Sequence, residues 1–516
     1  MKKFYLLFLM VALARLTGLA QVRYLNEVFT TWQYAKDSIY GNNFQVLTGT
    51  PIAVPLKCDI YQPPASDTVS KRPLIIMLHT GSFLPKYLNQ GPTGYKDDSA
   101  TIEIARGFAK RGYVVCVPAY RQGWNPAAST QEARAASIMQ AVYRAEQDAK
   151  AAVRYMKLRA AAFKIDVNKV VMGGQGTGGY IALTYAYVHS NAETRYSKFI
   201  GTGGLPFIDT AALGDIDNLL TGTMGTPNNP GVSSDINMIF TLGGAIGDIT
   251  WMNTGEIPVV GMHSWSDPFA PDTSGIVTVP GTPPQAVIPV DGSRNICRKA
   301  VQLALQPWKN CQFSDPYSVA AAANNEGISG YYRFRIPYPA PYVYQAAPWE
   351  WWDSATTVGI AYLTYKAIGT PDTTALKNAK ACNANGLATN QFMSKAKALA
   401  YIDTIQNYLA PRIMVALHLP GYLGPCPQGG VGVSNPVKET SAIEVYPNPA
   451  KGMFTIKATG EIKNIILTDI SGRVILNQEH NGLSEISINR NDISNGIYFL
   501  RVVTSKGDSV QRLILE

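Results

Sequence analysis

Residues 169–183 read Lys-Val-Val-Met-Gly-Gly-Gln-Gly-Thr-Gly-Gly-Tyr-Ile-Ala-Leu, and they decide the fold of the chain. The stretch begins with a β-branched apolar run, contains five glycines between 173 and 179, and continues as a small-and-apolar helical pattern to Tyr187. Glycine adopts dihedral angles that other residues avoid, and without a Cβ it lets a helix lie close to a strand. The stretch therefore predicts a strand, a sharp turn and a helix.

A glycine-rich turn between a strand and a helix is also used to hold the phosphates of a dinucleotide. That motif is expected early in a chain, with an acidic residue about 20 positions further on. The turn at residue 174 instead follows several predicted strands and helices. Dinucleotide binding is therefore the minor alternative.

The chain has 516 residues, which is enough for a large core and an appended domain. Residues 1–20 combine a Met-Lys-Lys start, an apolar run over 4–14 and small residues at 18 and 20, the pattern of a secretory signal peptide. A membrane-spanning helix needs a run of about 18 apolar residues, and no later run in the sequence is close to that length. We expect an exported protein that is soluble or bound to a surface.

The net charge argues against nucleic-acid binding. The value of +9 falls to +6 once Lys2, Lys3 and Arg15 leave with the signal peptide, and no stripe of Lys and Arg is present. We expect no nucleic acid, no metal and no cofactor.

Strands and helices alternate along the chain before and after the glycine-rich turn. Residues 73–78 and 112–118 are apolar runs typical of strands buried on both faces of a sheet. Residues 101–111 and 131–163 have helical spacing. The alternation predicts an α/β fold, with a mostly parallel sheet and helices on both of its faces.

Four pieces in a fixed order resemble the esterase branch of the α/β-hydrolases, and the similarity extends over roughly residues 45–410. The pieces are Leu56–Pro63, the HGGxF-like loop His79-Thr80-Gly81-Ser82-Phe83, Gln147–Arg154 with Ile165–Asn168, and the turn Gly174-Gln175-Gly176-Thr177-Gly178. The resemblance implies an α/β-hydrolase domain over residues 21–423. It also implies that Gly176 stands where the G-x-S-x-G turn carries its nucleophilic serine.

The other members of a catalytic triad are incomplete in this sequence. Asp267, in His-Ser-Trp-Ser-Asp-Pro, matches the acid position of the family, although an ordinary Asp-Pro turn would look the same. The family's histidine would fall near Ala346 or Ala347, and the chain has no histidine between 264 and 417. His418 follows a helical run and Pro411, so we interpret it as a surface or packing residue rather than a displaced base.

Three functional hypotheses follow from the resemblance. The favoured one is a secreted or surface-bound pseudoenzyme that binds rather than hydrolyses. The alternative is a working carboxylesterase or carbohydrate esterase with an unconventional nucleophile, such as Thr177 or Ser82. The third is a surface structural protein that makes contacts with copies of itself.

Aromatic residues are dense between 331 and 352, where nine of them occur. Tyr and Trp rings stack on sugars and anchor interfaces, but they could equally wall a lid over the old pocket. The candidate contacts with a glycan, an acyl ligand or a second copy of the chain are Gln175, Thr177, Trp349, Trp351 and Trp352.

The composition changes after residue 423. Residues 424–441 have the composition of a linker, and residues 442–516 contain short β runs separated by turns, as in a small β-sandwich. The motifs Val445–Ala450, Asp469–Arg473 and Gly496–Tyr498 resemble the type A C-terminal sorting domain of the type IX secretion system of Bacteroidota. The resemblance implies export by that machinery, removal of the domain, and then release or attachment to surface lipopolysaccharide.

Six cysteines permit three disulfides in an exported chain. Cys58 and Cys116 lie on strands that the family places side by side, which makes them the first expected pair. Cys297 and Cys311 flank a helical run and form the second, and Cys382 and Cys426 then remain as the third.

Overall fold

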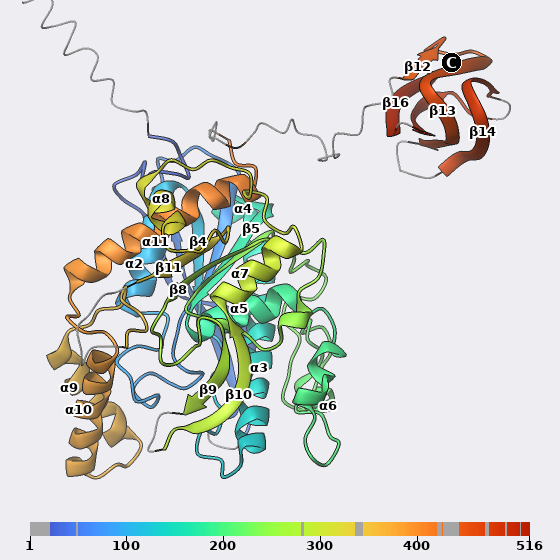
Figure 1. Cartoon of the computed structure of the whole chain (residues 1–516). Helices are drawn as coiled ribbons and strands as arrows, with labels where there is room; N and C mark the ends of the chain where they lie inside the picture. The colour runs from blue at the N-terminus through green and yellow to red at the C-terminus, as the bar shows by residue number, and fades with distance from the viewer. Residues whose placement is uncertain are drawn as a thin grey trace, which may run out of the picture. The chain divides into compact units, whose positions relative to one another are not determined.

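A computed structural model describes residues 21–47, 50–279, 283–335, 344–420, 426, 443–469, 474–490, 493–505 and 507–516. The predicted signal peptide, and the predicted linker except for Cys426, lie outside the described residues. The chain divides into two compact units, Met1–Pro427 and Gln428–Glu516. Figure 1 shows a large sheet with helices in the first unit and only strands in the second.

Eight strands form the large sheet: β1 (Gln33–Gln45), β2 (Ile52–Gln62), β3 (Arg72–Leu78), β4 (Val114–Pro118), β5 (Ile165–Gln175), β6 (Met238–Leu242), β8 (Val259–Ser264) and β11 (Tyr331–Phe334). Their order is β1-β2-β4-β3-β5-β6-β8-β11. Strand β2 runs antiparallel to both of its neighbours, and every other neighbouring pair is parallel. This order and the single reversed strand are those of the α/β-hydrolase fold, and the predicted fold class is confirmed.

Helices cover both faces of the sheet, as predicted (Figure 1). Helices α2 (Ser99–Arg111) and α11 (Lys395–Ala416) pack on one face, and α3 (Gln131–Leu158), α5 (Thr177–Tyr187) and α7 (Ser293–Gln302) on the other.

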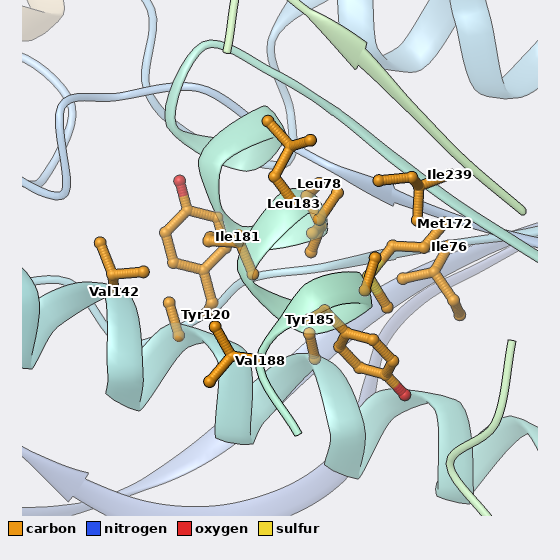
Figure 2. Close-up of a cluster of buried hydrophobic side chains, with 14 of the residues drawn as sticks. Ile76, Leu78, Tyr120, Val142, Met172, Ile181, Leu183, Tyr185, Val188 and Ile239 are labelled. Carbon is orange, nitrogen blue, oxygen red and sulfur yellow. The ribbon is translucent and has the colours of Figure 1, made fainter. Parts of the chain in front are cut away.

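Successive residues of a strand point to opposite faces. Along β3, Ile76 and Leu78 therefore join the core with α3 and α5, while Ile75 and Met77 join the core with α2 and α11. Figure 2 shows Ile76 and Leu78 in one cluster with Leu183 of α5.

The first unit contains further short elements. Strands β7 (Ala245–Ile246), β10 (Gln285–Gly292) and β9 (Ser274–Val279) form a small antiparallel sheet. The remaining helices are α4 (Ala160–Phe163), α6 (Thr210–Leu213), α8 (Pro316–Ala322), α9 (Ser354–Ala367), α10 (Asp372–Ala388), and the 3-10 helices η1 (Glu193–Arg195), η2 (Ser197–Phe199) and η3 (Ile249–Trp251). None of the helices in the described ranges is both long and apolar enough to span a membrane.

A buried ion pair joins the end of β4 to α3. Asp148 is fully buried, and its carboxylate accepts hydrogen bonds from the Arg121 side chain at 2.9 Å and from the Arg121 backbone N–H at 2.7 Å. Arg121 follows β4 by three residues, so the pair fixes where the chain leaves this strand. Burying a charged carboxylate costs free energy, and the paired cation offsets that cost. Without Arg121, the buried charge of Asp148 would be uncompensated.

The second unit is an antiparallel sheet of β12 (Ile443–Tyr446), β13 (Met453–Asp469), β14 (Val474–Asn489), β15 (Gly496–Thr504) and β16 (Gly507–Leu515). Alternate residues of β13, among them Phe454 and Ile456, are fully buried. They pack with Leu500 of β15 and Leu513 of β16 in one apolar core. The alternating runs of the sequence thus predicted this β domain correctly.

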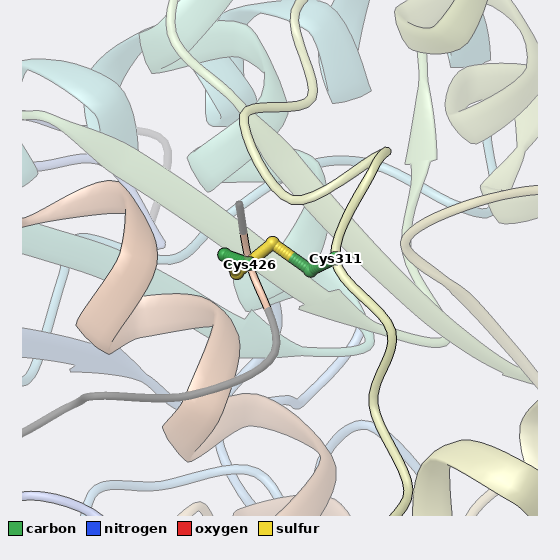
Figure 3. The surroundings of a disulfide bond; sticks show 2 residues. All are labelled: Cys311 and Cys426. Atoms are coloured by element: carbon green, nitrogen blue, oxygen red, sulfur yellow. A yellow bond between two sulfur atoms is a disulfide. The ribbon is translucent and has the colours of Figure 1, made fainter. Parts of the chain in front are cut away.

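The predicted disulfide pairs are wrong. One disulfide joins Cys311 to Cys426, while Cys58 and Cys116 are free and buried (Figure 3). The strands that carry Cys58 and Cys116 are neighbours, as expected. However, Cys58 lies opposite Pro118 and Cys116 opposite Ile60, so the two thiols are not cross-strand partners.

The other two predicted partners are buried singly elsewhere. Cys297 lies on α7, where its thiol donates to the carbonyl oxygen of Gly330. Cys382 lies on α10, where its thiol donates to the carbonyl oxygen of Tyr87 at 3.3 Å. Both thiols behave as small buried apolar groups with a weak donor.

We predict that replacing both Cys311 and Cys426 by Ala lowers the free energy of unfolding by about 2–4 kcal/mol, because the bond closes a long loop. The loop spans 115 residues. Urea unfolding of the variant, and of the reduced wild-type protein, should show the same loss. Four thiols should react in the denatured, non-reduced protein, and a mapped Cys58–Cys116 bond would contradict the structure.

We also predict that Asp148→Asn costs about 3–5 kcal/mol of unfolding free energy, because Arg121 then remains buried without a counter-charge. Glu103→Gln is the matched control, since Glu103 and Arg106 form a half-exposed pair at 3.7 Å. That control should change stability by less than about 0.5 kcal/mol. An equal loss of unfolding free energy in the two variants would show that the buried pair stabilises the fold no more than the exposed pair does.

Candidate active site

The glycine-rich turn lies between β5, which ends at Gln175, and α5, which begins at Thr177. Gly176, between them, has φ 49° and ψ −116°. This conformation is strained for residues with a Cβ, and a strained turn of this kind holds the nucleophile of α/β-hydrolases. Gly176 is half-buried at the carboxyl ends of the parallel strands and offers no side chain.

The side chain of Thr80 fills the space above Gly176. A Cβ added to Gly176 would lie 2.4 Å from the Thr80 hydroxyl oxygen and 3.3 Å from its Cβ. A serine at 176 would therefore force Thr80 to move. The Thr80 hydroxyl makes no hydrogen bond within the described ranges, so it is available to a ligand.

The oxyanion-like loop is held from below by an aromatic stack. The His79 ring lies on Tyr120, with centroids 4.3 Å apart and planes 11° from parallel. His79 Nδ1 donates to the carbonyl oxygen of Thr80 at 2.5 Å, and burial lowers the pKa of His79 to about 4. His79 is therefore neutral at physiological pH and serves to position the loop.

The Tyr120 hydroxyl joins the two halves of the site. It donates to the carbonyl oxygen of His79 at 2.9 Å and lies 3.0 Å from Thr177 Oγ1. The Thr177 side chain is thus engaged with Tyr120. The backbone N–H groups of Thr177 and Gly178, in the first turn of α5, have no partner in the described part of the chain. Such N–H groups can hold a carbonyl or carboxylate oxygen.

Further along the same oxyanion-like loop, Gly81 has φ 135° and Ser82 has φ 54°. A Cβ on Gly81 would lie 2.7 Å from the Cα of Gly94, so only glycine fits there. Ser82 is exposed, and its carbonyl oxygen accepts from the Trp124 ring N–H at 2.7 Å.

Asp267 lies in the loop after β8, at the same edge of the sheet as Gly176. Its Oδ1 accepts from the backbone N–H of Phe269 at 2.8 Å and of Ala270 at 3.2 Å. Burial raises its pKa, although the two N–H groups and nearby His263 oppose this. These bonds are also those of an Asp-initiated turn, so the local geometry fits either role of Asp267.

His263 lies near Asp267 but is held by other partners. Its Nε2 lies 3.6 Å from Asp267 Oδ2, but the ring is held between Ser293 Oγ at 2.9 Å and the carbonyl oxygen of Ala270 at 3.0 Å. The ring is fully buried within the first unit. To contact a substrate, the His263 ring would have to break its hydrogen bonds with Ser293 and Ala270.

The segment expected to carry a histidine runs beside the Asp267 loop. The backbone N–H of Gln345 donates to the carbonyl oxygen of Ser266 at 3.3 Å, and that of Ala346 donates to Thr389 at 3.0 Å. Ala346 and Ala347 bring no imidazole to this place. His418 instead follows α11, where it is exposed and adopts a φ of 48°.

Two of the predicted ligand contacts point into the protein. Gln175 is 1% exposed and donates to Thr101 Oγ1 of α2 at 2.7 Å. Trp349 is also 1% exposed and packs near Phe334. Neither side chain is available to a ligand in this structure.

The other two tryptophans contact helix α10 and the core. Trp352 donates its ring N–H to Asn383 of α10 at 2.8 Å, and Trp351 packs against the core with α2 and α11. Of the aromatic stretch 331–352, residues 336–343 lie outside the described residues.

Acidic residues that no motif revealed lie near the site. Glu350 accepts from Thr93 Oγ1 at 3.0 Å, and Asp98 pairs with Lys86 at 2.8 Å. Burial, assisted by the charge of Asp98, raises the pKa of Glu350 to about 8. Glu350 is therefore largely protonated at neutral pH and can donate a hydrogen bond. Only the fold brings Thr93 and Glu350 together, so sequence spacing offered no signal.

Two family matches cover different parts of the chain. Residues 58–216 match the BD-FAE family, and residues 444–516 match the secretion system C-terminal sorting domain. The first match contains the loop at His79 and the turn at Gly176. The second covers the β domain.

Solved structures of esterases share a limited likeness with the chain. The butyrate-bound esterase Est2 of the planctomycete Thermogutta terrifontis is 17% identical, with a TM-score of 0.30 over 46% of this chain and 74% of that one. Its propionate-bound form is 14% identical, with a TM-score of 0.31 over 65% and 94%. A bifunctional GH43-CE protein of Bacteroides eggerthii is 17% identical, with a TM-score of 0.30 over 46% and 32%.

No curated protein matches the sequence. The strand order of the first unit and the two family matches nevertheless agree with each other. The chain joins an esterase-like α/β-hydrolase domain to a type IX secretion C-terminal sorting domain, and it is a secreted or cell-surface protein of the Bacteroidota.

Proposed function

We propose that this protein is a non-catalytic member of the esterase-like α/β-hydrolases, which binds a ligand or partner at the bacterial surface. The observation that carries the proposal is the turn at Gly176. A residue without a side chain occupies the strained position, and the Thr80 hydroxyl occupies the space of a Cβ there. Hydrolysis through an acyl-enzyme needs an activated nucleophile, and glycine supplies none.

The absence of a base supports the same conclusion. In a Ser-His-Asp triad the acid orients a histidine that takes the proton from the nucleophile. The segment that meets the Asp267 loop through Gln345 continues with Ala346 and Ala347, and His263 is held by other partners. Two of the three functions of a triad are therefore missing together.

What remains suits binding. Thr80 offers a free hydroxyl, the first turn of α5 offers N–H groups, and Glu350 can donate or accept a proton. We propose a glycan or acyl ligand, or self-association, as the use of this region. Attachment of the processed chain to surface lipopolysaccharide belongs to the same proposal.

A secreted carboxylesterase or carbohydrate esterase is the second candidate, and one observation favours it. The Thr80 hydroxyl, which has no partner in the described part of the chain, lies close to where the nucleophile of an active relative would be. Thr80 is thus a better candidate nucleophile than Thr177, which is bound to Tyr120. Ser82 is exposed but lies further along the loop.

We predict no turnover of p-nitrophenyl acetate or butyrate above the buffer rate, because the described residues bring no nucleophile and base together at the turn. An oxyanion site alone can give about 10³–10⁴-fold over water, so a slow background is tolerated. A fluorophosphonate probe should label neither Thr80 nor Ser82 in peptide mapping. Fast turnover that Thr80→Ala abolishes, with the fold intact, would establish the esterase instead.

We further predict that the Gly176 and Thr80 positions are coupled in stability. Gly176→Ala should cost about 1–3 kcal/mol, from backbone strain and from the contact with Thr80. In the Thr80→Ala background the same change should cost about 0.5–1 kcal/mol less. Urea unfolding of the four proteins measures this cycle, and strict additivity would show that Thr80 does not fill the space of the missing side chain.

A further inference from the structure

Three half-exposed aromatic side chains gather at the loop that follows β8. Trp265 is 51% exposed, Phe269 47% and Tyr344 57%. Trp265 and Phe269 belong to this loop, and Tyr344 precedes Gln345, whose backbone N–H donates to the carbonyl oxygen of Ser266 in the same loop. Two separate segments therefore bring three rings to the carboxyl edge of the sheet. We call Trp265, Phe269 and Tyr344 the aromatic rim.

Arginines of β11 lie beside the aromatic rim. The Arg333 guanidinium lies over the Trp265 ring, 5.8 Å from its centroid, where the negative face of the ring attracts a cation. Strands β8 and β11 are neighbours, and the Trp265 N–H donates to the carbonyl oxygen of Phe334 at 3.2 Å (Figure 1). The backbone of Arg335, the next residue, therefore also lies beside Trp265.

The cations of this region outnumber the carboxylates that are bonded to them. Glu326 accepts from Arg294 Nε at 3.0 Å and from Arg333 Nη1 at 3.2 Å, and Arg298 lies 3.9 Å from it. The second carboxylate, Asp272, lies 3.3 Å from Arg333 Nε. Three guanidinium groups thus share two carboxylates, which leaves one positive charge unbalanced.

Arg335 adds a second positive charge. It is exposed and has no carboxylate partner in the described ranges. Asp267, which lies between the rings in sequence, has a side chain that is only 6% exposed, and its Oδ1 is bonded to two backbone N–H groups. The surface beside Trp265 is therefore cationic, and a partner that fits it carries negative charge.

Aromatic faces next to guanidinium groups match the chemistry of an acidic sugar. The C–H face of a sugar packs on an aromatic ring, and the planar guanidinium fork binds a carboxylate through two parallel hydrogen bonds. Trp265 has Arg333 against one face, so it offers a flat surface rather than an anchor that fills a pocket of a protein partner.

We propose that the aromatic rim, with Arg333 and Arg335, binds a carboxylate-bearing oligosaccharide made of uronic acid units. This inference rests on the binding role proposed above and gives its ligand a chemical class. The ligand lies at the same edge of the sheet as Gly176, but its contacts are side chains that the hydrolytic chemistry of the fold does not use.

The test compares two ligands that differ only at the carboxylate, an oligogalacturonate and its fully methyl-esterified form, by isothermal titration calorimetry of the purified full chain. The wild-type protein should bind the acid about tenfold more tightly, because hydrogen bonds to a charged group are the stronger ones. Trp265→Ala should weaken both ligands about tenfold, because buried ring surface is lost. Arg335→Gln should weaken only the acid.

Matched controls separate this site from general adhesion. Phe499→Ala removes a half-exposed ring from the other unit, and Arg159→Gln removes an exposed arginine where α3 leads into β5, at the opposite edge of the sheet. Both variants should bind the acid as the wild-type protein does. Trp265→Phe keeps a flat ring and should retain most of the affinity. If Trp265→Ala lowers the melting temperature, Phe269→Ala supplies the second variant.

No binding of the acid, or equal affinity for the acid and the ester, would overturn the proposal. Unchanged binding by both Trp265→Ala and Arg335→Gln, or an equal loss in the two control variants, would overturn it as well. If no oligosaccharide binds and Trp265→Ala converts a wild-type dimer to a monomer, the rim is a protein interface instead. Methanol released from the ester would disprove the non-catalytic role separately, because binding of the acid does not depend on it.

Discussion

The first unit depends on close contact between the first turn of α5 and the ends of β3 and β5. A Cβ on Gly178 would lie 2.4 Å from the carbonyl oxygen of Leu78, and a Cβ on Gly174 would lie 2.3 Å from the carbonyl carbon of Gly178. Real side chains do not approach that closely. These two glycines therefore serve the packing of the helix on the sheet in this chain, independently of any chemistry at the turn.

Gly176 differs from its neighbours because no packing against backbone requires it. Its surroundings contain a single obstacle, the Thr80 side chain, which reaches over from the loop after β3. Removing a side chain from a close-packed site leaves a hollow that costs stability unless something fills it. With a threonine in the opposite loop, the turn keeps its density without a serine. At this one position, unlike at Gly174 and Gly178, backbone packing places no requirement on the side chain.

The parts of the structure that follow from local patterns could be predicted from the sequence. The apolar runs at 73–78 and 112–118 predicted buried strands, and the order of motifs predicted the loop at His79 beside the turn at Gly176. Contacts between distant residues could not be predicted. Thr93 and Glu350 are 257 residues apart, and Cys311 and Cys426 are 115 apart, so no periodicity joins them. Composition also cannot give the direction of a side chain, and Trp349 was expected at a ligand but points into the core.

The disulfide has a mechanical consequence. Helix α11 is the last helix among the described residues of the first unit, and Cys426 follows it close to the boundary at Pro427. Tension applied to the chain beyond that boundary reaches Cys426 first and passes through a covalent bond to Cys311, whose neighbourhood packs against the core. The load therefore bypasses the hydrogen bonds of α11, which would otherwise be peeled away one turn at a time. The first unit should therefore resist mechanical unfolding when force is applied from its C-terminal end.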